Sequence, residues 1–528
     1  MPSFRVSLGP ALLAGALAVA PAAADDVHDQ HQHARPEKLG TVSFPTSCAP
    51  AVQARFVRAV ALLHSFWYEE AEKAFGEVAA ADPSCAIAQW GVAMSLYHPI
   101  WSPPTAAELK RGQDAVAKAR AAAAKTERER DYVAAIEAFF KDADTVDHRP
   151  RAVAYERAME RLAERYPDDR EASIFYALVL VGTASPADKT YANQKKAGAI
   201  LNRVLPAQPD HPGVAHYLIH SFDYPELAEL ALPAARSYSK IAESSPHALH
   251  MPSHIFVRLG LWDDAIRSNV DSAAAARAHC DKTHPGATSF DELHAVDYLT
   301  YAYLQEGRDA DALRMVERVR QVDKLDNAQF AAAYALAAVP ARYALERGRW
   351  AEAASLEVAP ASFPWASFPY AEAITHFARA IGAARSGDIT RARQAVERLA
   401  ALRQAAIDAK IGYWPEQIEI QRRAAAGWLA RAEGRNDEAL DLLKQAADLE
   451  ATTDKHPVTP GAVLPARELR ADLLMDLGRP AEALAEYEAS LKVAPKRRYA
   501  LAGAARAADA AGQGEKAKAL KASLKAGS

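Results

Sequence analysis

The sequence has little cysteine and no long hydrophobic segment. Three cysteines, Cys48, Cys85 and Cys280, occur among 528 residues, too few for a small fold stapled by several disulfides. After the N-terminus, no stretch offers the roughly 20 consecutive apolar residues that a membrane-spanning helix needs. We therefore exclude a disulfide scaffold and predict no membrane span.

An excess of one charge is also missing. The chain has 63 Lys and Arg against 67 Asp and Glu, for a formal net charge of −4. No global positive field is available to hold a polyanion, so nucleic acid is not an expected partner. Half of the residues are hydrophobic, which is enough to build a folded core.

Common catalytic motifs are absent as well. The sequence contains no glycine-rich phosphate loop, no G-x-S-x-G nucleophile elbow and no C-x-x-C pair. These absences argue against the common nucleotide-binding proteins, serine hydrolases and thiol oxidoreductases. The segment from His216 to His220 has the spacing of a zinc metalloprotease helix, but Tyr217 stands where the catalytic Glu belongs. We predict no catalytic residue, and an enzyme is the less favoured interpretation.

The N-terminus has the features of a secretory signal peptide. Arg5 precedes an apolar stretch from Ala11 to Ala20, and small residues follow up to Ala24. We predict that residues 1–24 are cleaved near Ala24, which makes the protein periplasmic or secreted. Export permits a disulfide, and Cys48 and Cys85 are the candidate pair because they flank one expected helical hairpin.

Residues 25–49 are expected to form a flexible, histidine-rich leader. The beginning of this segment is polar, contains His28, His31 and His33, and shows no apolar periodicity. These imidazoles could bind copper, nickel or zinc.

From residue 50 onward, Ala, Leu, Glu, Arg and Lys dominate, as is typical of helices. A small residue, a large apolar residue four positions later and Pro twelve positions later recur along the chain. Glycine followed by Ala after five residues recurs too, as in Gly260 with Ala265 and Gly307 with Ala312. Gly permits a tight helix end, Ala permits close helix crossing, and Pro stops the second helix.

This pattern resembles the tetratricopeptide repeat family, and the clearest copy is Gly478, Ala483, Tyr487 and Pro495. The resemblance implies an all-α, right-handed superhelical solenoid of stacked helix-turn-helix hairpins, with a concave groove lined by the first helix of each repeat. Several repeats are longer than the family unit. We expect an N-terminal array over residues 50–359, an irregular loop rich in Pro and aromatics over 360–369, and a C-terminal array over 370–528.

Histidines are concentrated between residues 211 and 294. Counting within the repeats places several of them on groove-facing positions, and His216/His220 and His250/His254 have the i, i+4 spacing that can chelate a metal. Pro252 lies between the second pair and could spoil their shared face. The candidate metal ligands are His216, His220, His247, His250, His254 and His294. Oxygen groups of Asp223, Glu292 and Asp297 could assist them.

A second set of residues is a candidate ligand-binding surface of the groove. Aromatic and histidine side chains gather in the first repeats, and the Trp101 segment contains too much Pro for a helix, so it could cover the mouth of the groove. The candidates are His64, Trp67, Tyr68, His98, Trp101, Arg258 and Tyr298.

Two hypotheses for function follow. The resemblance implies a scaffold that binds a protein or peptide partner in its groove, and no cofactor is certain. The alternative is a periplasmic protein, with or without enzymatic activity, that binds a small ligand or a divalent transition metal such as zinc or copper through the histidines. Histidines of this kind also pack between helices without any ligand, and that structural role is the one we weigh most heavily.

Overall fold

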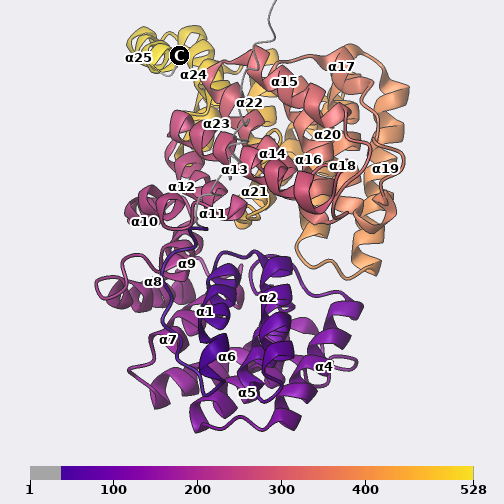
Figure 1. The fold of residues 1–528 in the computed structure, drawn as a ribbon. Helices are drawn as coiled ribbons and strands as arrows, with labels where there is room; N and C mark the ends of the chain where they lie inside the picture. Colours follow the sequence, from indigo (N-terminus) through magenta and orange to yellow (C-terminus); the bar gives the residue numbers. More distant parts are fainter. Residues whose placement is uncertain (1–36, 527–528) are drawn as a thin grey trace, which may run out of the picture. The chain divides into compact units, whose positions relative to one another are not determined.

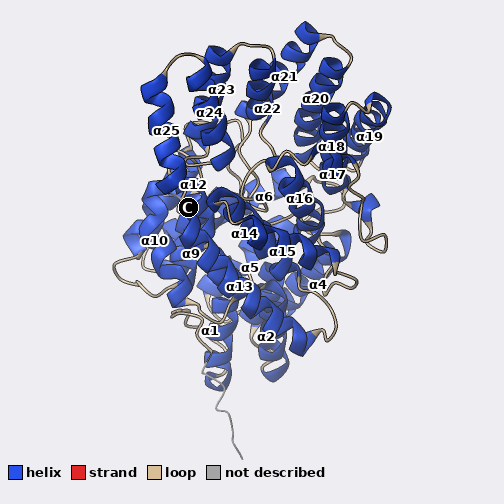
Figure 2. Ribbon diagram, turned by 90° about the horizontal axis from the view of Figure 1, so that it is seen from above, coloured by secondary structure: helices blue, strands red, loops and turns tan. Residues whose placement is uncertain are grey.

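The computed structural model describes residues 37–526. This part of the chain is helical almost throughout and contains no β-strand, only an isolated bridge between Thr288 and Leu325 (Figure 2). Within it, no helix is both long and apolar enough to cross a membrane. The predicted signal peptide and the leader histidines His28, His31 and His33 fall outside the described residues.

The first half of the helices runs as follows: α1 (Pro50–His64), α2 (Tyr68–Ala81), α3 (Ala86–Ser95), α4 (Ala106–Ala122), α5 (Glu127–Phe140), α6 (His148–Arg165), α7 (Arg170–Gly182), α8 (Ala192–Val204), α9 (Pro212–Phe222), α10 (Ala228–Ile241), α11 (Pro246–His250), α12 (Pro252–Leu259) and α13 (Trp262–Thr283). The second half comprises α14 (Phe290–Glu306), α15 (Asp309–Arg320), α16 (Phe330–Glu346), α17 (Trp350–Ala354), the 3-10 turn η1 (Trp365–Ser367), α18 (Pro369–Ser386), α19 (Ile389–Asp408), α20 (Trp414–Ala432), α21 (Asn436–Thr452), α22 (Ala466–Asp476), α23 (Pro480–Val493), α24 (Arg498–Ala510) and α25 (Gly514–Ala526).

Consecutive helices pack as hairpins, and alternate helices pack in series (Figure 1). Helices α14, α16, α18, α20 and α22, which are first helices of successive hairpins, each contact the next one in this list. This arrangement is the all-α solenoid of helical hairpins that the sequence predicts.

The repeated Gly, aromatic and Pro positions have the roles that their chemistry predicts. Gly478 ends α22 with a left-handed φ of 70°, a conformation that favours glycine. Tyr487 on α23 is fully buried and fills the space left by Gly503 on α24, where a Cβ atom would lie 2.4 Å from the ring. The aromatic ring therefore joins one hairpin to the next.

Residues 38–49, which the sequence predicts to belong to a flexible leader, are held against the helices. The Lys38 amide donates to Ser244 Oγ, and the Thr41 amide donates to the Asp210 carbonyl. Phe44 is 1% exposed and packs among aromatic rings of α1, α3 and α5. Hydrogen bonds and buried apolar side chains thus hold a segment that lacks helical periodicity.

Cys48 and Cys85 form a disulfide, which ties this segment to the start of α3. Cys280 is buried and free. The region 360–369 contains η1 and leads directly into α18, and Trp365 is buried there with its indole N–H donating to the Pro360 carbonyl.

Candidate functional site

The six candidate metal ligands come from first helices of three successive hairpins. His216 and His220 lie on α9, His247 and His250 on α11, His254 on α12, and His294 on α14. Pro212, Pro246 and Pro252 each stand at the first turn of their helix, where the missing N–H costs nothing. The break between α11 and α12 at Pro252 does not separate His250 from His254, because their Nε2 atoms are 3.0 Å apart.

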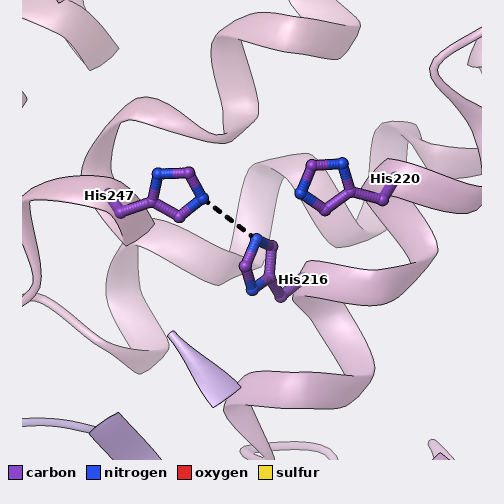
Figure 3. A group of neighbouring side chains, drawn as sticks. All are labelled: His216, His220 and His247. Carbon is purple, nitrogen blue, oxygen red and sulfur yellow. Dashed lines mark hydrogen bonds between the residues drawn. The ribbon is translucent and has the colours of Figure 1, made fainter. Parts of the chain in front are cut away.

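Three of these residues form what we term the His216 cluster: His216, His220 and His247. One ligand nitrogen from each lies within 4.8 Å of the others, and Figure 3 shows the three rings turned toward one another. His216 Nε2 and His247 Nε2 are 3.2 Å apart, while His216 Nδ1 donates to the backbone carbonyl of His64. His220 Nε2 is buried without a hydrogen-bond partner.

The other three form the His254 cluster: His250, His254 and His294, also with one ligand nitrogen each within 4.8 Å. His250 Nδ1 is 2.6 Å from Asn269 Oδ1, and His254 Nδ1 is 3.0 Å from Asp223 Oδ2. Neither ring nitrogen of His294 has a hydrogen-bond partner. The two clusters are adjacent, because the ring centroids of His220 and His254 are 5.9 Å apart.

The sequence predicts that these histidines line a concave groove, and the structure shows that their side chains are covered by other parts of the described chain. All six imidazoles are buried, with exposures between 0% and 7%. Phe66, which follows α1, packs on His216, His220 and His247. Trp101 packs on His247 and His294. The N-terminal hairpins thus cover positions that would face solvent in an isolated repeat array.

Burial also sets the protonation of the clusters. Removal from water lowers the pKa of His216 to about 3 and lowers the pKa of the other five histidines below its ordinary value. The imidazoles are therefore neutral at pH 7, and neutral imidazole is the form that ligates metals.

Asp223 connects the His254 cluster to charged groups behind it. Its carboxylate accepts from His254 Nδ1, Arg258 Nε and Lys455 Nζ at 2.8–3.0 Å. Although burial alone would raise it, Lys455 and Arg258 hold the pKa of Asp223 well below its usual range. Asp223 orients a cluster imidazole, whereas Glu292 pairs with Arg277 and Arg318 and Asp297 pairs with Arg342.

A further buried group, which we term the Glu171 triad, consists of His64, Glu171 and His211. His64 Nε2 and His211 Nε2 each donate to one oxygen of Glu171 at 2.9 Å. His64 Nδ1 accepts from the Tyr217 hydroxyl, and His211 Nδ1 accepts from the Val214 amide. Every ring nitrogen and carboxylate oxygen has a partner, so these groups complete one another without any ligand.

Most of the side chains predicted to bind a ligand in the groove instead pack against, or hydrogen-bond to, other parts of the protein. His64 belongs to the Glu171 triad, and Tyr298 is buried on α14 with its hydroxyl donating to the Pro457 and Thr459 carbonyls. Trp67 packs on His279, Tyr68 packs on His98, and Trp101 covers the histidine clusters. Only Arg258, among the seven candidates, lines the cavity described next.

A cavity of about 770 Å³ lies in the C-terminal half of the described chain. Its walls come from the first helices of successive hairpins, from α21 and α23, and from loop residues between helices. Aromatic and apolar side chains dominate these walls: Tyr301, Tyr334, Tyr370, Phe377, Trp414 and Ile418. Sequence reasoning missed these residues, although their large rings on first helices of the repeats were a usable signal.

Polar and charged side chains also line this cavity, among them Arg258, Glu450 and Lys455. Gln421, on α20, lines it, and its side-chain oxygen is buried without a hydrogen-bond partner. The loop 453–465 between α21 and α22 forms another wall, and Arg342 fixes this loop by donating to the carbonyls of Gly461 and Ala462.

Comparisons with known proteins agree with the repeat pattern. A family model described as tetratricopeptide repeat matches residues 464–497. No curated protein matches the sequence. Solved structures with similar folds include the human IFIT1 dimer with m7Gppp-AAAA, at 10% identity and a TM-score of 0.40, covering 83% of this chain and 90% of that chain.

Two other solved structures have still lower TM-scores. The APC/C hetero-tetramer Cut9-Hcn1 has 14% identity and a TM-score of 0.32, covering 86% of this chain and 83% of that chain. The TPR domain of P58(IPK) has 11% identity and a TM-score of 0.21, covering 88% and 99%. The matched segment contains Gly478, Ala483, Tyr487 and Pro495, and such repeats support a role as a protein-binding scaffold. Residues 464–497 thus match a tetratricopeptide repeat, within a described chain built as an all-α array of helical hairpins.

Proposed function

We propose that the chain is an exported scaffold that binds a protein or peptide partner in the cavity of its C-terminal hairpins. The observation that carries this proposal is the aromatic-lined cavity, which Gln421 also lines; the buried Oε1 atom of Gln421 has no hydrogen-bond partner. A buried polar atom without a partner is costly. A peptide supplies both the backbone N–H that this oxygen needs and apolar side chains that suit the Tyr and Trp walls.

Export is supported by two features of the N-terminal region. Residues 1–24 have the charge, apolar stretch and small residues of a signal peptide. Cys48 and Cys85 are bridged, as is common in oxidising compartments. N-terminal sequencing of the mature protein is expected to begin at Asp25, whereas an intact Met1 terminus would contradict export.

Peptide binding can be tested by selecting ligands from a random peptide library on the purified full-length chain. The selected peptide is then measured by calorimetry against Ala451→Trp, which places a large ring on an exposed cavity-lining position, and against Gln421→Ala. We expect the Trp variant to abolish binding and the Gln421 variant to weaken it about tenfold, the value of one hydrogen bond.

Lys444→Ala, at an exposed position of α21, is the matched control and should bind as the unmodified chain does. Equal affinity of the Ala451→Trp variant and the unmodified chain would contradict the proposed site.

A further inference from the structure

We propose that the two histidine clusters bind a pair of transition-metal ions, zinc(II) or copper, each held by three imidazoles. His216, His220 and His247 would hold one ion, and His250, His254 and His294 the other. This inference is independent of the peptide-binding cavity, because none of the six histidines lines that cavity.

The distances between ring nitrogens suit such a site. A metal with Zn–N bonds of about 2.0–2.1 Å in tetrahedral geometry separates its ligand nitrogens by roughly 3.3 Å. The Nε2 atoms of His216 and His247 are 3.2 Å apart, and those of His250 and His254 are 3.0 Å apart. The remaining ligand nitrogen of each cluster lies within 4.8 Å, so a small side-chain movement closes the site.

The hydrogen bonds of the His254 cluster leave two Nε2 lone pairs facing each other when both rings are neutral. Asn269 donates from Nδ2 to the Ala265 carbonyl, which orients its Oδ1 as the acceptor for His250 Nδ1–H. Asp223 is a carboxylate and only accepts, so His254 Nδ1 also carries its proton. Both neutral rings therefore direct a lone pair from Nε2 toward the other at 3.0 Å. A bound metal ion converts this repulsion into two coordinate bonds.

Partners of the outer ring nitrogens resemble a typical second shell. Metal-bound histidines usually donate their other N–H to a carboxylate or a carbonyl, which fixes the tautomer. His254 donates to Asp223, His250 to Asn269, and His216 to the His64 carbonyl. Three of the six rings are thus oriented with Nε2 directed into the clusters.

Unpartnered nitrogens provide an independent observation. His220 Nε2 and both ring nitrogens of His294 are buried without hydrogen-bond partners. Buried polar atoms are normally paired, and a site that leaves them unpaired is suited to a ligand. All-imidazole donor sets suit zinc and copper, and three such ligands leave one coordination position open.

The test is a zinc titration of the full-length chain, carrying His28→Ala, His31→Ala and His33→Ala so that the leader does not contribute. Zinc(II) alone is added in competition with a chromophoric chelator, and bound zinc is counted per chain. His220→Phe and His294→Phe each remove a ligand without removing a hydrogen bond. His148→Phe is the matched control, because His148 also has a buried unpartnered Nδ1 but lies outside both clusters.

We expect two zinc ions in the unmodified background and in the His148 variant, and one ion in each cluster variant. X-ray absorption of the zinc-loaded chain should show nitrogen ligands at about 2.0 Å with imidazole scattering. Circular dichroism of each metal-free variant verifies that it is folded. The proposal would be overturned if the folded background chain bound no zinc, or if both cluster variants still bound two ions. A single ion in the background chain would overturn the proposal of two metal sites.

Discussion

The Glu171 triad and the two histidine clusters are neighbouring groups of buried imidazoles with opposite chemistry. In the triad, a carboxylate accepts from both histidines and every polar atom is paired. In the clusters, imidazole faces imidazole, and three ring nitrogens have no partner. The triad has two histidines and a glutamate, and each cluster has three histidines, all of them buried. The arrangement of donors and acceptors therefore separates a structural group from a candidate ligand site.

Glu171→Ala is expected to cause the largest loss of stability. It removes the acceptor of two buried histidine N–H groups, and breaking a buried pair of this kind costs about 3–5 kcal/mol. Urea unfolding followed by circular dichroism measures the change. Glu164→Ala, at an exposed position of α6, is the control and should change the free energy by less than about 0.5 kcal/mol. A loss for Glu171→Ala as small as the control's would mean that the triad is not structural.

The pH dependence of the metal-free chain should report the clusters. Burial lowers the pKa of His220 and His294 well below 6.5, so the unfolded chain binds more protons below pH 6.5. Stability is therefore retained above pH 6.5 and lost as the pH falls, by up to about 1.4 kcal/mol per pH unit for each histidine. Between pH 6 and pH 5, the free energy of unfolding of the double variant His220→Phe/His294→Phe should fall by about 2 to 3 kcal/mol less than that of the unmodified chain. Urea unfolding with a chelator present measures both values. Parallel curves for both chains would contradict this expectation.

Gly213→Ala tests how tightly the triad is packed. A Cβ atom at this position would lie 2.4 Å from His64 Nδ1, so the ring must move away from Tyr217. We expect a loss of about 2 kcal/mol, although alanine otherwise favours a helix over glycine. Gly76→Ala on α2 has nothing within 4 Å of the added atom and should raise the melting temperature. A stabilised Gly213 variant would show that the triad tolerates displacement.

His294→Phe should have the smallest effect on the metal-free chain. It replaces a buried ring that has no hydrogen bonds by an apolar ring of similar shape, a change that is nearly neutral, within about 1 kcal/mol. The rise in melting temperature on adding zinc should nevertheless shrink. Thermal unfolding with and without zinc measures both effects. A loss as large as that of Glu171→Ala would remove the distinction between the clusters and the triad.

Much of the fold could be predicted because its determinants are local. Gly478, Ala483, Tyr487 and Pro495 act within one hairpin and its immediate neighbour, so their spacing is readable in the sequence. The convergence of the cluster histidines follows from the same register. Their complete burial does not, because Phe66 and Trp101 come from hairpins far away in the sequence.

The roles of Glu171 and His211 could not be predicted for the same reason. Neither belongs to a repeated motif, and each becomes informative only when α7 and α9 bring it beside His64. The sequence also could not show whether Pro252 separates His250 from His254. In the structure the chain continues from α11 to α12 with the two rings still adjacent. The cavity residues carried a signal, since Tyr334 and Trp414 are large rings on first helices, but rings there also fill cores.

The contacts of Asp223 have a consequence for communication within the chain. One oxygen pair joins His254 to Arg258 and Lys455, and the latter two residues line the C-terminal cavity. A ligand that displaces Lys455 removes one of the charged partners of the carboxylate that orients a cluster imidazole. If a cavity ligand changes the metal affinity of the His254 cluster by some factor, a metal bound there changes the affinity of that ligand by the same factor, because linkage is reciprocal.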